Sequence, residues 1–462
     1  MQLTLDEINN AMSGVVLNSG IRRFYSAVSI DSRKTAEGDL FVAMKGSRTD
    51  GHLYVSSAIN RGAGGIIISD RTCISGIPAE VAIILVPDTL RALHQLASYV
   101  RKNSHAAFVC ITGSMGKTTT KEFAAVLVQR KKKVLKSEGN LNSLTGLPLS
   151  LIKIMPFHEI ALLEMAMNHK GEIAQLTQVA QPHIGLITNI SEVHLEYFGT
   201  LEAIAEEKLS MVSNVPEYAT IVYNNDDIFL RMISSTRRYS YGINHPSDLM
   251  IRNLKEKLPY GYEGELSEEG KFYQFYFPVR GMWNVYNLLA AVSIARNAQI
   301  DWETILETIP QLEIPERRGR IDTLRDGITL IDETYNSNPR ALYETILDFS
   351  KRNLGNRKIV ILGDMLELGA DEAIFHSLLG EKIAHLPLDV VIAIGNLSSN
   401  VVRSIENVPE SFIKTYHFEK SEECVHFVSS FVRPGDAILL KGSRAIRVDL
   451  VSEAIKHNYS LH

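Results

Sequence analysis

The sequence has no pattern that predicts disulfide bonds, a membrane-spanning segment or an export signal. Its 462 residues include only three cysteines, Cys73, Cys110 and Cys424, whose odd number and wide spacing indicate no disulfide framework. The opening MQLTLDEINNAMSG lacks the basic segment and apolar run of a secretory signal. No run of about 18 apolar residues is present to span a bilayer. We therefore expect a protein of the reducing cytoplasm, without membrane insertion.

A strong charge of either sign is also missing. The chain has 48 Lys+Arg against 53 Asp+Glu, a net charge of −5 with histidine neutral. Such a chain has no overall attraction for nucleic acid or an anionic membrane, so any phosphate that it binds must be held by a local site. Hydrophobic residues make up 45% and charged residues 22%, which excludes a disordered, collagen-like or coiled-coil protein. We expect small-molecule partners, no nucleic acid, and a monomer.

Short apolar runs alternate with longer amphipathic stretches along most of the chain. In Lys117–Arg130, for example, Phe123, Val126 and Leu127 fall at i, i+3 and i+4 of a helix. Strands that alternate with helices indicate an α/β fold with parallel sheets and crossover helices. The expected strands are Leu40–Met44, Gly65–Ile68, Val81–Val86, Ala106–Ile111, Ile160–Met165, His183–Ile190, Ile328–Asp332, Lys358–Leu362, Val390–Ile394 and Ala437–Leu440.

Two proline-containing stretches mark candidate domain boundaries. Pro87–Asp88 separates a strand from a helix, and the segment from Pro310 to Pro315 precedes a new strand–helix series. Between them, Met250–Val279 predicts an antiparallel hairpin, because KFYQFYFPV follows a polar turn that contains glycine. We therefore expect three domains, at 1–86, 87–313 and 314–462.

The strongest local signal is a glycine-containing loop between a buried strand and a helix. The strand runs into Gly113-x-x-Gly116-Lys117-Thr118 and then directly into the helix. Glycines let successive backbone N–H groups converge on phosphate oxygens, and the helix N-terminus adds partial positive charge. Lys117 can reach the β- and γ-phosphates, and a threonine hydroxyl can bind Mg²⁺. Ile111 stands where the standard loop has its first glycine, and the alternative is a turn that only caps a helix.

Three further residues, which are described next, are candidates for a site at the phosphate-binding loop. Glu164 ends one predicted strand and His194 follows another, so both lie at strand carboxyl ends, where ligands bind in parallel sheets. Taken singly, Glu164 could be a helix cap or ion-pair partner and His194 an ordinary histidine. Lys208 lies in a predicted helix that begins near Thr200. Its spacing favours a solvated lysine that the neighbouring acids keep protonated.

Nine sequence blocks, read in order, resemble the Mur ligase family over essentially the whole chain. Their common order is far more specific than any single loop. The blocks are VSIDSRKTAEGDLFVAMKGSRTDGH, ITGSMGKTTTKEF, GNLNSLTGLPLSL, LLEMAMNHKGEI, ITNISEVHLEYFGTLEAIAEEK, GMWNVYNLLAA, IDETYNSNP, ILGDMLELG and LLKGSRAIRVDLV.

The resemblance implies a three-domain architecture: a UDP-sugar-binding domain, a central P-loop-type parallel-sheet ATPase domain and a C-terminal Rossmann-like ligase domain. It also implies amide synthesis driven by ATP with Mg²⁺, through an acyl phosphate, in cytoplasmic peptidoglycan precursor synthesis. The implied substrates are a UDP-N-acetylmuramoyl-tripeptide and D-alanyl-D-alanine.

The resemblance also implies roles for individual residues. Lys117, Glu164, His194 and Lys208 would be catalytic. Thr118, Glu164, His194 and Lys208 would serve the Mg²⁺ sites, Lys208 as a carbamylated lysine. The implied ATP-binding residues are Gly113, Ser114, Met115, Gly116, Lys117, Thr118, Thr119, Asn284, Asn287, Arg318 and Asp332. The implied substrate-binding residues are Asp31, Ser32, Arg33, Lys45, Asp50, Gly51 and His52 for the UDP-sugar, Asn140 and Asn142 for the muramoyl-peptide, and Tyr335, Asn336, Asn338, Asp364, Lys441, Ser443 and Arg444 in the third domain.

Some positions depart from the family pattern, and other functions stay open. Met115 replaces the usual Asn or Val, Ser143 replaces an Asn, and Glu333 replaces an Asp. The first alternative is the family member that adds the preceding amino acid, or a folate polyglutamate ligase. The blocks DETYNSNP and LGDMLELG favour the dipeptide-adding member, and the UDP-type first domain argues against the folate enzyme. A different class is a nucleotide switch without ligation, which has no use for the three metal-site residues together.

Overall fold

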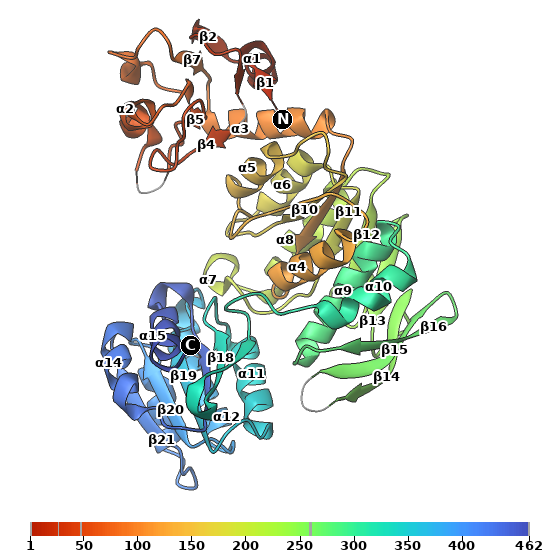
Figure 1. The fold of residues 1–462 in the computed structure, drawn as a ribbon, viewed down its shortest axis with the longest axis vertical. Helices are drawn as coiled ribbons and strands as arrows, with labels where there is room; N and C mark the ends of the chain where they lie inside the picture. Colours follow the sequence, from red (N-terminus) through yellow and green to blue (C-terminus); the bar gives the residue numbers. More distant parts are fainter. Residues whose placement is uncertain (1, 26, 47–48, 258–260, 461–462) are drawn as a thin grey trace.

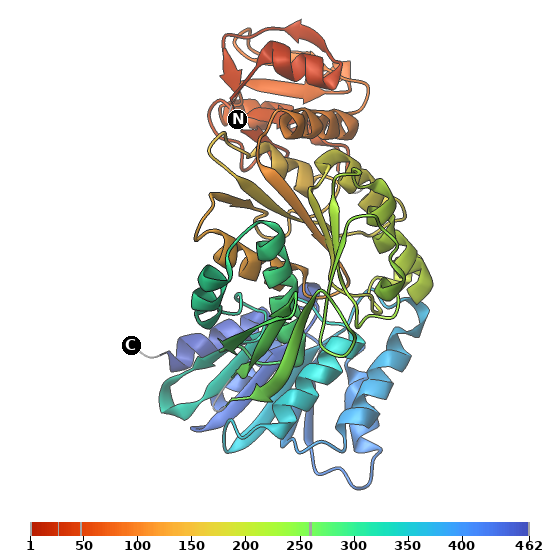
Figure 2. The ribbon, with the colours of Figure 1, turned by 90° about the vertical axis from the view of Figure 1, so that its right-hand side faces the viewer.

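Three large β-sheets and one two-stranded pair follow from the described residues. The structure, a computed structural model, describes residues 2–25, 27–46, 49–257 and 261–460. Figures 1 and 2 show three bodies stacked along the long axis, with the N-terminal part at one end, the C-terminal part at the other and the central part between them. The predicted α/β fold with parallel-sheet domains is confirmed.

The N-terminal sheet has five short strands in the order β2-β7-β6-β5-β4. All neighbouring pairs are parallel except β2 with β7. A separate antiparallel pair, β1 with β3, lies beside helix α1. The elements are β1 (Leu3–Thr4), α1 (Leu5–Met12), β2 (Val15–Asn18), β3 (Phe24–Tyr25), β4 (Val28–Ser29), β5 (Leu40–Val42), η1 (Gly51–Tyr54), α2 (Val55–Asn60), β6 (Gly65–Ile68), η2 (Arg71–Ile74) and β7 (Ala82–Leu85).

Helix α3 (Thr89–Lys102) joins the N-terminal part to the central part. Its N-cap is Asp88, whose carboxylate accepts the Arg91 N–H at 2.7 Å. The helix packs against α1 on one side and against α5 (Gly146–Ile152) and α6 (Glu172–Ala180) on the other. Met12 of α1, Leu96 of α3 and Leu151 of α5 therefore belong to one continuous hydrophobic core. The first two parts of the molecule share buried apolar surface, which couples their positions.

The central sheet has nine strands in the order β16-β15-β14-β13-β12-β11-β8-β10-β9. Strands β9 to β14 are parallel, and β14, β15 and β16 form an antiparallel meander at one edge. The strands are β8 (Ala107–Thr112), β9 (Val134–Lys136), β10 (Ile160–Glu164), β11 (Ile184–Ile187), β12 (Thr220–Asn224), β13 (Arg238–Gly242), β14 (Leu249–Glu256), β15 (Tyr262–Glu268) and β16 (Lys271–Phe277).

Helices cover both faces of the central sheet. Along β8, Phe108 and Cys110 face one core while Val109 and Ile111 face the other, as the two-residue period of a strand requires. Helices α3, α5, α6 and α8 lie on the first face, and α4, α9 and α10 lie on the second. The helices not yet given are α4 (Lys117–Val128), α7 (Leu195–Phe198), α8 (Leu201–Asn214), η3 (Leu230–Met232), α9 (Met282–Asn297), α10 (Trp302–Thr308) and η4 (Ile309–Gln311).

The C-terminal sheet has six strands in the order β17-β18-β22-β19-β20-β21, all parallel except β17. Helices α11, α12 and α13 cover one face, and α14 and α15 cover the other. The elements are β17 (Arg320–Thr323), η5 (Arg325–Gly327), β18 (Thr329–Glu333), α11 (Pro339–Lys351), β19 (Arg357–Gly363), η6 (Gly369–Asp371), α12 (Glu372–Ile383), β20 (Val390–Ile394), α13 (Ser399–Glu406), β21 (Lys414–Phe418), α14 (Ser421–Phe431), β22 (Asp436–Lys441), η7 (Arg444–Ile446) and α15 (Asp449–Tyr459).

The structure contains all ten predicted strands, with ends that shift by a few residues at most. The helix predicted over Lys117–Arg130 ends at Val128. The predicted hairpin in Met250–Val279 is part of a three-stranded meander that extends the central sheet, and its residues 258–260 lie outside the described residues. The domain boundaries near 86 and 313 stay a prediction. Within the described ranges, none of the helices combines the length and apolar character that crossing a membrane requires.

Candidate active site between the central and C-terminal parts

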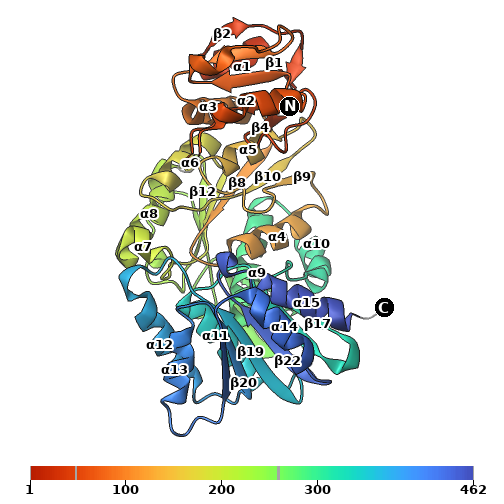
Figure 3. The same cartoon turned by 90° about the vertical axis from the view of Figure 1, so that its left-hand side faces the viewer.

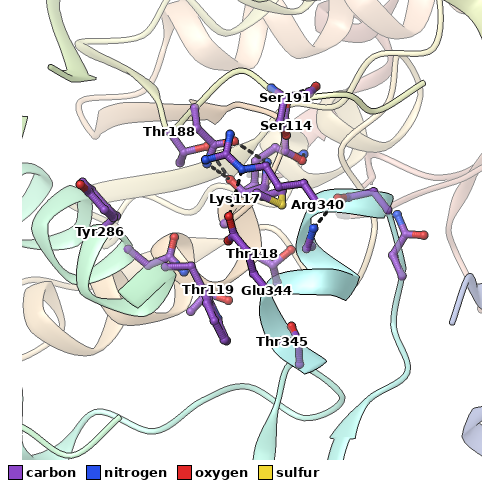
Figure 4. Close-up of a pocket in the computed structure, with 18 of the residues that line it drawn as sticks. Ser114, Lys117, Thr118, Thr119, Thr188, Ser191, Tyr286, Arg340, Glu344 and Thr345 are labelled. Carbon is purple, nitrogen blue, oxygen red and sulfur yellow. Dashed lines mark hydrogen bonds and ion pairs between the residues drawn. The ribbon is translucent and has the colours of Figure 1, made fainter. Parts of the chain in front are cut away.

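A cavity of about 1320 Å³ lies where the central sheet faces the C-terminal sheet. The loops that follow β8, β10, β11 and β12 line its central side, so the carboxyl ends of four strands of one sheet meet there. One side of α11, along its whole length, and the loops after β18, β19 and β22 line the opposite side. Figure 4 shows the phosphate-loop side chains of the central part close to those of α11.

The glycine loop after β8 is built by close backbone approach. Gly113 and Gly116 have φ values of 138° and 82°, which disfavour any residue with a side chain. A Cβ on Gly113 would lie 1.9 Å from Thr188 Oγ1, and a Cβ on Gly116 would lie 2.2 Å from Asn287 Oδ1. Both glycines are therefore needed for the loop to pack against the β11 loop and α9. Ile111, at the place of the missing first glycine, is buried within β8.

Lys117 begins α4 directly after this loop. Its ammonium group donates to the carbonyl oxygens of Gly113 at 2.7 Å and Ser114 at 3.3 Å. Burial lowers its pKa, while nearby Glu164 opposes that shift. Because neutral carbonyls hold the ammonium, its positive charge is available to an anion at the loop. This placement fits the predicted contact with phosphate.

Glu164 ends β10 at the wall of the cavity and is 3% exposed. Its Oε2 accepts from Thr118 Oγ1 at 3.0 Å, and its Oε1 accepts from Asn142 Nδ2 at 2.9 Å. The ammonium of Lys121, a buried residue of α4, lies 4.0 Å from Oε2. The structure thus brings the carboxylate and the threonine hydroxyl together, as the two strand-end motifs predict, and adds the amide of Asn142.

His194 lies at the start of α7 and faces the C-terminal part. It is in the left-handed region, with φ 56°. Its Nδ1 lies 2.6 Å from Oε2 of Glu367, in the loop after β19. Hydrogen bonding to His194 lowers the pKa of Glu367. His194 lines the cavity, so the histidine belongs to the site.

Lys208 lies on α8, which has Thr200 as its N-cap, as predicted. The interpretation of Lys208 as a solvated helix lysine is wrong, because the residue is 1% exposed. Its Nζ donates to Met167 Sδ at 3.6 Å. Burial, reinforced by the charge of Lys117, lowers its pKa well below the ordinary value. Lys208 is not among the residues that line the cavity.

The C-terminal part supplies cations to the cavity. Arg318 donates from Nη2 to Thr118 Oγ1 at 2.9 Å, and its guanidinium carbon lies 3.6 Å from the ring centre of Tyr335. Lys441 forms an ion pair with Glu333 at 3.3 Å, and burial lowers the pKa of Lys441. The predicted site residues that line the cavity are Ser114, Met115, Gly116, Lys117, Thr118, Thr119, Asn140, Asn142, Glu164, His194, Asn284, Asn287, Arg318, Tyr335, Asn336, Asn338, Lys441, Ser443 and Arg444.

Two predicted carboxylates do not line the cavity. Asp332 accepts from Ser452 Oγ at 2.7 Å and from Lys456 Nζ at 3.1 Å, so it ties β18 to α15. Asp364 accepts from the backbone N–H of Ser398 at 2.7 Å. Both side chains are buried and satisfied inside the C-terminal part. Their predicted ligand contacts are not made in this arrangement and stay predictions.

The residues predicted for the UDP-sugar form a separate cluster in the N-terminal part. Arg33 pairs with Asp31 at 2.9 Å and lowers the pKa of Asp31 to about 2. His52 Nδ1 lies 2.6 Å from Asp50 Oδ1, and His52 Nε2 accepts from the Ser69 N–H at 2.9 Å. Ser32, Lys45 and Gly51 lie in the same segments. The N-terminal part that carries these residues lies at the opposite end of the molecule from the C-terminal sheet (Figure 1).

Sequence reasoning missed the residues that support the phosphate loop. Asn189 accepts the Met115 N–H at 3.0 Å, and its backbone carbonyl accepts the Ser114 N–H at 2.9 Å. Thr188 Oγ1 donates to the Met115 carbonyl at 2.6 Å, and Ser191 and Ser114 exchange two hydrogen bonds (Figure 4). The sequence feature that could have identified these residues is the segment TNIS (residues 188–191), which places polar residues at the end of a buried strand.

Comparisons with known proteins assign the chain to a family. Family models match residues 24–101 (Mur ligase family, catalytic domain), 111–295 (Mur ligase middle domain) and 318–444 (Mur ligase, glutamate ligase domain). A Bacillus subtilis protein named UDP-N-acetylmuramoyl-tripeptide–D-alanyl-D-alanine ligase is 31% identical and covers 96% of each chain. Its Escherichia coli namesake is 28% identical and covers 99% of each.

Solved structures agree with these sequence comparisons. MurF from Acinetobacter baumannii has a TM-score of 0.88 at 28% identity and covers 99% of each chain. MurF from Thermotoga maritima in complex with ADP has a TM-score of 0.79 at 28% identity and covers 94% of this chain and 97% of that one. The fold and site thus define an ATP-dependent ligase built around a phosphate loop. The chain belongs to the Mur ligase family.

The steric role of Gly116 can be tested by substitution. We expect Gly116→Ala to lower the affinity for ADP at least tenfold, about 1.4 kcal/mol, because its Cβ would displace Asn287 and distort the loop. Gly270→Ala is the matched control, since Gly270 also has a positive φ (77°) but open space around it. Titration calorimetry with ADP measures both. Wild-type ADP affinity in a folded Gly116→Ala protein would contradict this role.

Proposed function

We propose that this chain joins D-alanyl-D-alanine to UDP-N-acetylmuramoyl-tripeptide at the expense of ATP, through an acyl phosphate. The observation that carries the proposal is the Arg318–Thr118 hydrogen bond across the cavity, which places a C-terminal cation against the phosphate loop. Relatives named for this reaction, with similarity over nearly the whole chain, support it.

The reaction requires two anions to meet. The peptide carboxylate attacks the γ-phosphorus of ATP, which forms the acyl phosphate and releases ADP. The amine of the dipeptide then attacks the acyl carbon, which forms the amide and releases phosphate and a proton. Lys117 and Arg318 neutralise charge as the anions approach, in a site whose donors are already oriented. Asn140 and Asn142 lie at the cavity wall, where the peptide carboxylate would enter.

The donor set of the cavity fits Mg²⁺ bound together with a nucleotide. Mg²⁺ prefers oxygen ligands and keeps several waters, so it needs few protein ligands. Among the described residues no cluster of three His, Cys, Asp or Glu side chains forms a closed cage. Glu164 and the Thr118 hydroxyl, 3.0 Å apart, would hold the ion beside the phosphates. When bound, Mg²⁺ would draw electron density from the phosphoryl oxygens.

A carbamate on Lys208 would add oxygens on the same side of the site. Carbamylation requires a neutral amine, and the burial of Lys208 favours that form. An unmodified ammonium there would repel the metal and Lys117.

The UDP-sugar would bind the N-terminal cluster around Arg33 and His52, and the dipeptide would bind the loops of the C-terminal sheet. Water would hydrolyse the acyl phosphate, so closure of the C-terminal part over the cavity would protect it. We place these roles in domains at 1–86, 87–313 and 314–462. Cytoplasmic location and a monomeric state belong to the same proposal.

Phosphate release tests the function directly. Release that requires ATP, UDP-muramoyl-tripeptide and D-alanyl-D-alanine together supports ligation of the dipeptide. Release with a single amino acid and a UDP-substrate one residue shorter would favour the preceding ligase, and release with ATP alone would favour a nucleotide switch. Lys117→Ala should abolish release while circular dichroism shows a folded chain, and Lys133→Ala, an exposed lysine beyond α4, should behave as wild type.

The UDP-sugar site has its own test. We expect Arg33→Ala to weaken binding of the UDP-substrate at least tenfold and to leave ADP affinity unchanged, because Arg33 lies in the N-terminal cluster far from the phosphate loop. Arg71→Ala, an exposed arginine of the same part, is the control. Calorimetry with each ligand reports both affinities. Equal loss of ADP affinity would show that the two sites are not separate.

The carbamate has a chemical signature. We expect Lys208→Ala to be nearly inactive and to regain part of its activity in acetate or formate, because a free carboxylate can occupy the cavity left by the side chain. Lys208→Arg should stay inactive, since it keeps a positive charge but cannot be carbamylated. Steady-state ligation rates with and without added acid measure this. Normal activity of Lys208→Arg would identify the residue as a structural cation.

A further inference from the structure

In the loop after β19, Glu367 has no role in the function described so far. The loop comes from the sequence block ILGDMLELG and spans residues 364–368 between β19 and η6. It lines the cavity through Leu366 and Glu367, on the face opposite the phosphate loop.

Hydrogen bonds hold this loop in one conformation. The backbone N–H of Met365 donates to Nε2 of buried His376 at 3.0 Å. The backbone N–H of Leu366 donates to Ser443 Oγ at 3.0 Å, and the Ser443 N–H donates to the Asp364 carbonyl at 3.1 Å. These hydrogen bonds fix the backbone directly before Glu367, so its side chain extends from an ordered segment of the loop.

The loop contacts the central part at α7. Glu367 Oε2 lies 2.6 Å from His194 Nδ1, and the Glu196 N–H donates to the Glu367 carbonyl at 3.2 Å. A Cβ on Gly369 would lie 3.4 Å from Glu196 Cα, so the two backbones are in close contact. Figures 1 and 3 show α7 directly beside the C-terminal part. His194 and Glu367 both have left-handed backbones, with φ 56° and 65°, at the point of contact.

The contact determines which nitrogen of His194 is left for a ligand. A carboxylate beside Nδ1 favours the tautomer with its proton on Nδ1, so the lone pair is on Nε2. A carboxylate behind a histidine also fixes the ring and makes the free nitrogen a better electron donor.

We propose that Glu367 is a positioning residue that holds His194 with Nε2 free for the metal–nucleotide, so that this side of the metal site is complete only when the C-terminal part packs against α7. The inference rests on the proposed function. It assigns to the C-terminal part a role in metal binding in addition to gripping substrates. An ion pair that only holds the two parts together would affect closure but not the coordination of the metal.

The test uses Mn²⁺·ADP as a probe, with Mn²⁺ in place of Mg²⁺. Pulsed electron paramagnetic resonance should detect imidazole nitrogen coupling to Mn²⁺ in the wild-type chain. In Glu367→Ala this coupling should weaken or vanish, and kcat for ligation should fall 10- to 100-fold, with KM for the UDP-substrate within twofold of wild type. Glu367→Gln, which keeps an acceptor oxygen, should lose less. Glu196→Ala, an exposed neighbour at the same interface, is the matched control and should resemble wild type.

Three results would overturn the proposal. The first is wild-type nitrogen coupling in a folded Glu367→Ala protein, whatever its activity. The second is an equal loss in Glu196→Ala, which would indicate a general effect on the interface. The third is the absence of nitrogen coupling in a wild-type chain that ligates normally. Each leaves ligation by the wild-type chain intact, whereas failure of wild-type ligation would overturn the proposed function instead.

Discussion

The close approach of the backbone at Gly113 and Gly116 is the constraint on which the rest of the site depends. These two residues bring the end of β8 against Thr188 and Asn287, so that loops from two strands and helix α9 form one surface. Lys117 follows immediately and carries its charge over that surface. Strands β8 and β10 are parallel neighbours that end at the same edge of the sheet, and this alone places Glu164 at the surface.

Cations and carboxylates line the cavity together, with Lys117 and Arg318 at the phosphate loop. The chain carries a net charge of −5, yet the cavity collects Lys117, Arg318 and Lys441, all with pKa values lowered by burial. Cations withdrawn from water are costly unless anions compensate them, and a phosphate or carboxylate ligand would add to the compensation that Glu164 and Glu333 already provide. Binding such ligands relieves an electrostatic cost already present in the fold. Composition alone indicates no overall attraction for nucleic acid but is silent about this local field.

Much of the fold was predictable because it depends on local periodicity. Apolar runs such as Gly65–Ile68 and Val390–Ile394 are buried parallel strands with the predicted ends. The strands that were not predicted, among them β12, β13 and β21, carry tyrosine, asparagine, arginine or histidine, so their apolar pattern is broken. The position of the meander at the sheet edge could be determined only from the structure, since the sequence does not indicate that β14 pairs with β13.

The sequence by itself determined the α/β class, the phosphate loop and the strand-end positions of Glu164 and His194. These follow from spacing along the chain, and spacing is local. Only the tertiary structure decided that Lys208 is buried, that Asp332 and Asp364 are satisfied within their own domain, and that Glu367 reaches His194. The physical reason is that a polar side chain at a strand end or on a helix can face either a cavity or its own neighbours. Which of these it faces depends on residues distant in the chain, 34 positions apart for Asp364 and Ser398 and 120 for Asp332 and Ser452, that packing brings near.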